Sequence, residues 1–343
     1  MSTATIRDVA KIAGVGIGTV SRVLNDSPDV SERTRLKVLS AIEALDYTPN
    51  PIARRLSLGK TLTVGVIAPF FTRPSVVERL RGIENVLGAS EYDLIVFNVE
   101  TVARRDAYFR DVPRRERVDG LLIISLLPDE EDVQRLRRAQ MPVVLVDISH
   151  PAFSRVSIDD VAGGRLAAEH LLALGHRRIG FVSDYEDPSF DFTANNRRLQ
   201  GFRTALEAAG IAWHYRYHAA GRHSLASARE MAHRLMQLPA PPTAIFAASD
   251  TLAFGVLEAV QEMGLTVPDE VSVIGYDDIE VAEYLQLTTI RQSLFESGVK
   301  GGRLLLREIR LPPSTPEEIL LPTELVVRET TAPPARSERT IRR

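Results

Sequence analysis

Three residues near the amino terminus have the spacing of a helix-turn-helix. Ala10 offers a small side chain where two helices cross, Gly14 can adopt the positive φ of a tight turn, and Val20 can lock the second helix on the first. The polar side chains beside Val20 would then face the major groove and the flanking phosphates of a DNA duplex: Thr19, Ser21, Arg22 and Asn25. An ordinary three-helix bundle without a DNA role is the alternative at this point.

The glycines of the same segment partly match the glycine pattern of a dinucleotide-binding loop. Residues 14–18 have the first glycines of a dinucleotide-binding loop, but Thr19 stands where the last glycine is needed. A predicted helix, rather than a strand, precedes the run. We therefore expect no nucleotide cofactor.

Three histidines raise the question of a metal site. His214, His218 and His223 lie close in the sequence, but residues 213–217 alternate like a strand and no acidic ligand lies between the histidines. The chain also contains no Gly-x-Ser-x-Gly elbow, Walker loop or His-Glu-x-x-His helix. We expect no metal and no enzymatic activity.

Charge is distributed unevenly along the chain. The formal net charge of the 343 residues is −3. Residues 1–60 hold nine basic and six acidic side chains, so they carry +3 and the remainder carries −6. A small basic module joined to a large acidic body indicates that the amino-terminal end meets a polyanion.

Composition excludes several classes of protein. With 44% hydrophobic and 25% charged residues, the chain is typical of globular proteins and not of coiled coils or disordered chains. It has no cysteine, which excludes disulfide scaffolds and thiolate zinc sites. Because neither an export signal nor a run of about 18 apolar residues is evident, we expect a soluble, cytoplasmic protein.

The elements that position the DNA-facing residues are predicted to be helices. Thr5 with Asp8 forms a capping box for a first helix, and Ser31 caps a third. The expected apolar faces of the three helices within residues 5–46 are Ile6, Val9, Ala10 and Ala13, then Val20, Val23 and Leu24, then Leu36, Leu39, Ile42 and Leu45.

From Thr61 onward, short apolar runs alternate with amphipathic stretches. Strands are expected at 62–68, 94–98, 120–125, 143–147, 179–183, 244–248 and 271–276, with helices at 76–87, 161–174, 199–209, 226–238 and 251–263. This α/β alternation is typical of a doubly wound parallel sheet. Residues 61–330 exceed the usual size of one such domain, so we expect two lobes that face a cleft.

A series of short motifs runs through almost the whole chain: IRDVA (6–10), AGV (13–15), TVSRVLN (19–25), YTPN (47–50), VDGL (118–121), HL (170–171), LGHRRI (174–179), RLQGF (198–202), AIFAASD (244–250), VPD (267–269), VSVIGYDD (271–278) and LTTI (287–290). In this order and spacing they resemble the LacI/GalR family of bacterial transcription regulators.

The resemblance implies an all-α helix-turn-helix domain with a hinge helix, followed by a two-lobed body like that of periplasmic binding proteins, with doubly wound parallel sheets. We accordingly expect a DNA-binding domain at 1–48, a hinge helix and linker at 49–60, an effector-binding and dimerisation body at 61–330, and a flexible tail at 331–343.

The resemblance also implies the residues that touch DNA. Base edges are contacted from positions one, two and six of the second helix, here Ile17, Gly18 and Arg22. Arg22 can form a bidentate bond with guanine and Ile17 can meet a thymine methyl, whereas Gly18 offers no side-chain hydrogen bond. The positions that match backbone contacts are Thr5, Thr19, Ser21, Asn25, Ser31 and Thr34.

Residues 50–58 look like the family's hinge helix, with Ala53, Arg54 and Leu56 at the minor groove. The resemblance implies that the two hinge helices of a dimer pair in the minor groove and insert their Leu side chains into a central base step. Nine residues are too few for a stable isolated helix, so the hinge should fold only in a dimer on DNA.

The cleft of this family binds a small effector, most often a sugar or a nucleoside-like molecule. The matching positions are Asp147, Arg198, Ser249, Asp250 and Asp277. Phe70 and Phe71, which follow the first strand, and Ser125 are expected to line the near wall, and His223 stands where many relatives have an aromatic side chain that packs on the ligand. Carboxylates and a guanidinium suit a hydroxyl-rich ligand because each forms two directional hydrogen bonds. Ser249 departs from the Asn common in the family. Phe190 and Phe192 are expected either to stack on a sugar face or to pack in the core.

Together these features predict a homodimeric repressor whose partners are a pseudo-palindromic operator DNA and a small sugar-like effector. Effector binding would rotate the lobes and change the pairing of the hinges. The alternative is a secreted sugar-binding protein, which would share the body but would have no use for residues 1–60.

Overall fold

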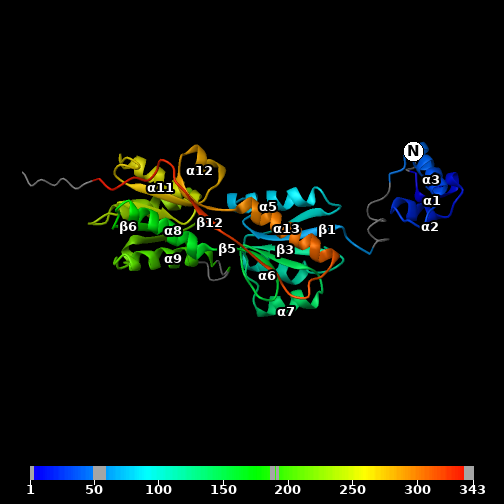
Figure 1. Cartoon of the computed structure of the whole chain (residues 1–343), viewed down its shortest axis with the longest axis horizontal. Helices are drawn as coiled ribbons and strands as arrows, with labels where there is room; N and C mark the ends of the chain where they lie inside the picture. Colours follow the sequence, from blue (N-terminus) through cyan, green and yellow to red (C-terminus); the bar gives the residue numbers. More distant parts are fainter. Residues whose placement is uncertain (1–3, 49–58, 186–189, 191–192, 336–343) are drawn as a thin grey trace, which may run out of the picture. The chain divides into compact units, whose positions relative to one another are not determined.

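The computed structural model describes residues 4–48, 59–185, 190 and 193–335. These residues divide between Leu62 and Thr63 into an amino-terminal unit and a larger body. The predicted hinge residues 49–58 and Phe192 lie outside the described residues. Figure 1 follows the chain from the amino-terminal helices into the body.

The amino-terminal unit consists of α1 (Ile6–Ala13), α2 (Ile17–Leu24) and α3 (Glu32–Ala44). Its core contains Val9, Ala10, Ala13, Val20, Val23, Val38 and Ala41. Gly14 ends α1 with φ of 65°, and the hydroxyl of Ser31 accepts the backbone N–H of Thr34 at 3.3 Å at the start of α3. The Asp8 carboxylate accepts the backbone N–H of Thr5 at 2.9 Å. The predicted turn and caps are confirmed.

The buried face of α3 differs from the prediction. Leu36 and Leu39 are 59% and 47% exposed, whereas Val38 and Ala41 are buried. The smaller side chains lie on the face that packs against α1 and α2, where the helices approach one another. The expectation that Leu36 and Leu39 face the core is therefore wrong, while Ile42 and Leu45 do pack against it.

The first lobe of the body contains a six-stranded sheet in the order β11-β5-β4-β3-β1-β2. All its neighbouring strands are parallel. The strands are β1 (Thr63–Pro69), β2 (Asp93–Val99), β3 (Gly120–Ile124), β4 (Val143–Val146), β5 (Ser154–Ile158) and β11 (Glu318–Leu321).

The second lobe repeats this design with the order β12-β10-β9-β8-β6-β7. Its pairings are parallel except for the antiparallel pair β10 and β12. The strands are β6 (Ile179–Asp184), β7 (His218–Gly221), β8 (Ala244–Ala247), β9 (Ser272–Asp277), β10 (Thr288–Gln292) and β12 (Thr323–Val326).

Helices pack in pairs against both sheets. In the first lobe α5 (Pro74–Leu87) contacts α13 (Leu294–Arg310), and α6 (Val102–Asp111) contacts α7 (Glu130–Arg138). In the second lobe α8 (Asp160–Ala173) contacts α9 (Ala194–Ala208), and α10 (Leu225–Met236) contacts α11 (Asp250–Glu262). The short helix α12 (Glu280–Tyr284) follows β9. Among the described residues, no helix has the length and apolar content needed to cross a membrane.

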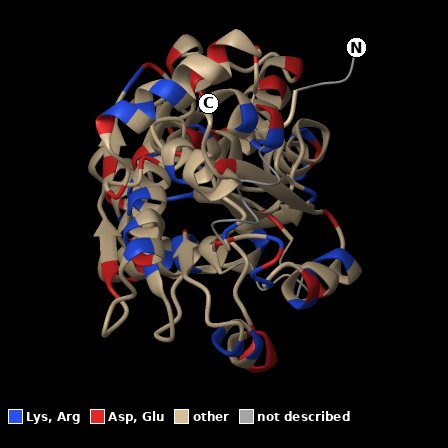
Figure 2. Ribbon diagram, turned by 90° about the vertical axis from the view of Figure 1, so that its right-hand side faces the viewer, with Lys and Arg blue, Asp and Glu red and all other residues tan. Residues whose placement is uncertain are grey.

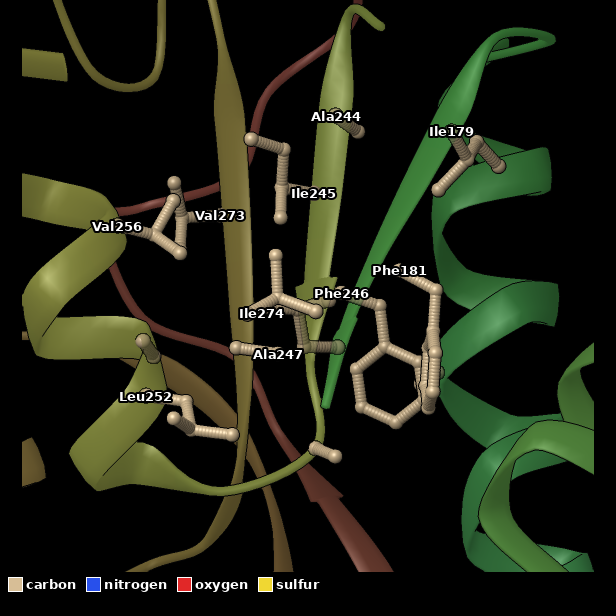
Figure 3. Packing of buried hydrophobic residues seen from close by; sticks show 14 of the residues in the cluster. Ile179, Phe181, Ala244, Ile245, Phe246, Ala247, Leu252, Val256, Val273 and Ile274 are labelled. Atoms are coloured by element: carbon tan, nitrogen blue, oxygen red, sulfur yellow. The ribbon is translucent and has the colours of Figure 1, made fainter. Parts of the chain in front are cut away.

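Successive side chains of a strand point to opposite faces of the first sheet, and a hydrophobic core lies on each face. Val64, Val66 and Ala68 of β1 join the cluster that contains residues of α5 and α13, whereas Ile67 joins the cluster of α6 and α7. In the second lobe, Phe181, Phe246 and Ile274 lie in one large cluster with helical residues such as Leu252 and Val256 (Figure 3). Both lobes thus have the predicted doubly wound parallel architecture.

The chain passes between the lobes three times: from β5 to α8, from β10 to α13 and from β11 to β12. Each lobe is therefore assembled from separate parts of the sequence. The sequence prediction missed β5, β7, β10, β11 and β12, which are only four or five residues long. β10, for example, reads TTIRQ and has no continuous apolar run.

Two further expectations need correction. Residues 213–217 do not form a strand, because Tyr215–Tyr217 is a 3-10 helix that precedes β7. The flexible tail was also expected to begin at Thr331, but Thr331 is hydrogen-bonded to His170 at 2.9 Å, and the carbonyl of Ala332 to His176 at 2.9 Å. These contacts on the second lobe hold the chain beyond the predicted boundary.

Candidate functional site

A cavity of about 90 Å³ lies where strands of both lobes end. It is lined from the first lobe by residues that include Ser125 and Asp147 and from the second by Arg198, His223, Ser249 and Asp277. These are six of the nine residues expected to bind an effector. Carboxyl ends of parallel strands that meet at a crevice form the usual ligand site of doubly wound folds.

The other three predicted residues lie elsewhere. Phe70 packs edge-on against Phe190 with ring centroids 5.8 Å apart. Phe71 is 44% exposed. Asp250 is fully buried: its carboxylate accepts the Thr289 hydroxyl at 2.6 Å and the backbone N–H of Ile279 at 2.9 Å. Neither phenylalanine nor Asp250 lines the cavity.

Several residues at the strand ends have a positive φ. Phe70, Ser125 and Asp147 directly follow β1, β3 and β4 and have φ of 43°, 53° and 69°, and Asp277 at the end of β9 has φ of 122°. Non-glycine residues rarely adopt positive φ, and such residues cluster at ligand sites. All four positions belong to the predicted effector set.

Arg79 organises the first-lobe side of the cavity. This side chain of α5 is only 1% exposed, and its Nη2 lies 2.6 Å from Oδ1 of Asp147 and donates to Oε1 of Gln292 at 3.0 Å. Oδ2 of Asp147 accepts the hydroxyl of Ser125 at 2.6 Å. Gln292 in turn donates its amide to Asp277, so one network joins residues of both lobes.

Arg198 organises the second-lobe side. Its Nε donates to Oδ1 of Asp160 at 2.8 Å and its Nη1 donates to the carbonyl of Ala248 at 2.6 Å. The guanidinium lies 3.8 Å from the ring centroid of Tyr276, whose hydroxyl also donates to Asp160 at 3.0 Å. These contacts fix the guanidinium at the cavity wall.

Glycines bring each of the two buried arginines close to a neighbouring helix. A Cβ atom at Gly298 of α13 would clash with the carbonyl oxygen of Arg79, and a Cβ at Gly164 of α8 would clash with that of Arg198. In each lobe, therefore, a glycine allows two helices to cross closely at the position of a cavity arginine.

Burial shifts the protonation of two groups in the cavity. It raises the pKa of Asp277 to about 6, against the opposing effects of Arg198, Gln292 and Arg79. Burial, with the nearby positive charge of Arg73, lowers the pKa of His223 to about 4. At neutral pH the Asp277 carboxylate is charged and His223, which is 3.2 Å from the Ser249 hydroxyl, is neutral.

Sequence reasoning missed six polar residues of the wall: Arg73, Ser75, Arg79, Asp184, Asn195 and Gln292. Nη1 of Arg73 lies 3.7 Å from Oδ2 of Asp184, an ion pair that joins the two lobes. One signal was available for Arg79. It occupies a buried position on the apolar face of α5 between Val76 and Ile83, where an arginine requires a partner.

In the amino-terminal unit, the residues expected at DNA bases are accessible. Ile17 is 45% exposed, Gly18 and Arg22 are also exposed, and nothing lies within 4 Å of a Cβ placed on Gly18. Among the expected backbone contacts, Thr5 and Ser31 are exposed, and Thr19, Ser21, Asn25 and Thr34 are half-buried. Arg35 braces the turn after α2 by donating to Asp26 and to the carbonyl of Ser27, each at 2.8 Å.

The hinge residues and the three histidines were also singled out in the sequence. The hinge residues Ala53, Arg54 and Leu56 lie outside the described part of the chain. His223 lines the cavity, whereas His218 is bonded to the Ser183 hydroxyl at 2.9 Å. Within the described ranges no group of three His, Asp or Glu side chains could hold a metal ion.

Comparison with known protein families matches both parts of the chain. The model described as "Bacterial regulatory proteins, lacI family" matches residues 5–50, and that described as "Periplasmic binding protein-like domain" matches residues 168–331.

Individual relatives extend over nearly the whole length. The HTH-type transcriptional regulator DegA of Bacillus subtilis is 34% identical over 336 residues, which cover 96% of this chain and 98% of that protein. The HTH-type transcriptional repressor PurR of Photobacterium profundum is 34% identical over 333 residues, covering 95% and 98%.

Two solved structures show the same likeness. A lac repressor dimer bound to operator and the anti-inducer ONPF superposes with a TM-score of 0.84 at 30% identity, covering 96% of this chain and 100% of that one. The transcriptional regulator CelR in complex with cellobiose superposes with a TM-score of 0.71 at 32% identity, covering 95% and 99%.

Proposed function

Because this chain belongs to the lacI family of bacterial regulatory proteins, we propose that it is a homodimeric repressor controlled by a small effector. It is a transcription regulator and not an enzyme, because the relatives that match nearly its whole length are transcription regulators. It binds operator DNA through α2 and acts in the cytoplasm, where the operator is. The alternative of a sugar-binding protein without a regulatory role fails because residues 5–50 match the lacI-family model.

One observation carries the proposal of effector control. The cavity at the strand ends is built from charged side chains of both lobes, and its polar network runs from Asp147 through Arg79 and Gln292 to Asp277. A molecule that bonds to both halves of this network changes how the lobes meet. A ligand can shift a conformational equilibrium only by such a difference in its contacts.

The lining favours a hydroxyl-rich effector. Carboxylates of Asp147 and Asp277 accept hydrogen bonds, whereas the guanidinium of Arg198 and the hydroxyl of Ser249 donate them. A sugar supplies both kinds of partner. The CelR structure, with its bound cellobiose, supports this assignment. His223 contributes a neutral ring on the same wall.

The cavity volume indicates a closed cleft. About 90 Å³ holds several water molecules but is smaller than the roughly 300 Å³ of a usual small-molecule pocket. Entry of a sugar therefore requires the lobes to separate, which breaks the ion pair between Arg73 and Asp184. The three chain crossings between the lobes would serve as the pivot.

DNA recognition is assigned to the exposed face of α2. Ile17, Gly18 and Arg22 meet base edges, and the hinge residues Ala53, Arg54 and Leu56 enter the minor groove when two subunits pair. Contacts with the phosphates set the register, from Thr5, Thr19, Ser21, Asn25, Ser31 and Thr34. The lac repressor dimer bound to operator supports this arrangement.

Selection of bound duplexes from a random DNA library tests the proposal. The full-length protein should enrich one sequence with twofold pseudo-symmetry, because each subunit presents the same recognition helix. Thermal-shift measurements with a panel of mono- and disaccharides, cellobiose among them, then identify an effector. Enrichment of no sequence, or of a site without twofold symmetry, would contradict a homodimeric operator-binding protein.

A further inference from the structure

A second cavity lies in the second lobe, at the opposite ends of the strands that reach the effector cavity. Its volume is about 380 Å³. β6 begins at this cavity with Ile179 and ends at the effector cavity with Asp184. The lining residues are Arg177, Arg178, Ile179, Leu206, Gly210, Ile211, Ala212, Trp213, His214, Arg216, Tyr217 and Ala240.

The charge of this cavity is entirely positive. Arg177, Arg178 and Arg216 line it, and no acidic residue does. Within the described ranges, none of the three arginines belongs to an ion pair. This is unusual in a body that carries −9 over residues 61–335. Elsewhere on the chain, Figure 2 shows basic and acidic residues mixed along the helices.

Neutral groups hold two of the guanidinium groups in place. Arg177 donates to the carbonyls of Leu172 at 3.3 Å and His176 at 3.0 Å, and Nε of Arg178 donates to the carbonyl of Pro241 at 3.0 Å. Carbonyl oxygens orient a guanidinium without cancelling its charge. Positioned arginines of this kind recognise carboxylate and phosphate groups.

An aromatic side chain forms another part of the wall. Trp213 is half-buried and packs edge-on against Phe202, with ring centroids 5.6 Å apart. Its indole N–H is buried and has no hydrogen-bond partner among the described residues. Because the indole N–H is buried, a molecule in the cavity would contact the apolar part of Trp213 and not its donor.

We propose that this cavity is a second ligand site, which takes a small organic anion with a planar apolar body and a carboxylate or phosphate group. The anionic group is bound by the guanidinium groups of Arg177, Arg178 and Arg216. The apolar body lies against Trp213 and its neighbours Leu206 and Ile211. The volume falls within the usual range for small-molecule sites.

The chain provides its own reporter for this site, because Trp213 is its only tryptophan. Tryptophan emission of the full-length protein is measured during titration with phenyl phosphate, phenylacetate and the neutral 2-phenylethanol. We expect a saturable change with one or both anions and none with the alcohol. The anion that binds more tightly distinguishes a phosphate site from a carboxylate site.

Substitution of two exposed arginines tests the assignment. Arg178→Gln combined with Arg216→Gln should weaken binding of the preferred anion by at least about tenfold, because charge-assisted hydrogen bonds are lost. Arg110→Gln, which removes an exposed guanidinium from the first lobe, should leave binding unchanged.

Three results would overturn the proposal. They are an emission change of equal size with the neutral alcohol, no saturable change with either anion at millimolar concentration, and unaltered anion binding by the doubly substituted protein. Circular dichroism of each variant separates loss of binding from loss of fold.

Discussion

Individual charged residues carry most of the proposed specificity, and each is held by identifiable partners. Arg79 and Arg198 are buried beside Asp147 and Asp160, at nitrogen to oxygen distances of 2.6 and 2.8 Å. Their energetic value lies in fixing donors at the cavity wall, because the cost of burying such pairs largely offsets their attraction. Arg22 on α2 differs from these two buried arginines, because its side chain is exposed and is available to DNA.

Arg22→Ala should weaken operator binding by about 1–3 kcal/mol and relax the preference for one base pair, because a bidentate arginine bond to guanine is lost. Fluorescence anisotropy with the selected operator and with single-base variants of it measures both effects. Lys37→Ala removes an exposed charge from α3 and serves as the control. A uniform loss on every sequence would assign Arg22 to the phosphates instead.

Asp277 should make effector binding depend on pH. Its pKa of about 6 means that the carboxylate becomes protonated, and loses its charge as an acceptor, as the pH falls through that value. Affinity for the effector should therefore fall about tenfold between about pH 7 and pH 5. His223, with a pKa of about 4, stays neutral over this range and does not add to the effect.

Calorimetric titration of the sugar identified by thermal shift, at several pH values, measures this dependence. Asp277→Asn should bind more weakly than the unsubstituted protein, and its affinity should not vary with pH over the same range. A pH dependence that persists in this variant would assign the titration to another group.

At the scale of elements, glycines at helix crossings determine where the cavity arginines lie. Gly298 of α13 lies against the backbone of Arg79 on α5, so no Cβ atom fits there. Gly302 on the same helix is less crowded, since a Cβ would lie 3.3 Å from the nearest atom of Val86. The two positions form a matched pair of variants.

Gly298→Ala should lower the free energy of unfolding by about 1–3 kcal/mol, because overpacking forces α5 and α13 apart. It should also weaken effector binding, since Arg79 moves with α5. Gly302→Ala should change both quantities little. Urea unfolding and sugar titration measure them. Equal effects of the two substitutions would show that the close crossing at Gly298 does not position the site.

Elements also show how much a single sequence reveals. The apolar runs predicted the central strands β1, β3, β4, β6, β8 and β9, and the family resemblance assigned Asp147 and Asp277, at the ends of two of them, to the effector site that they line. The short strands β10 and β12 were missed because pairing with neighbours across long separations stabilises them, which local patterns do not record. Asp250, at a helix start, proved to be a buried hydrogen-bond acceptor and does not line the cavity.

At the scale of the whole molecule, charge separates the two binding functions. Residues 1–60 carry +3 and residues 61–335 carry −9. Operator affinity should fall steeply as salt rises, because DNA binding releases counterions, whereas affinity for a neutral sugar in the enclosed cavity should change little. Anisotropy and calorimetry over a series of potassium chloride concentrations measure the two slopes. Similar slopes would contradict this separation.

A molecule bound in the cavity between the lobes is expected to control DNA binding. The most direct test measures operator affinity with and without the identified sugar, and sugar affinity with and without operator. Thermodynamic linkage predicts that the two ratios are equal and differ from one. Asp277→Asn, with its weakened sugar binding, should retain operator binding but require more sugar for the same response. A sugar that binds with no change in operator affinity would show that the cavity does not control DNA binding.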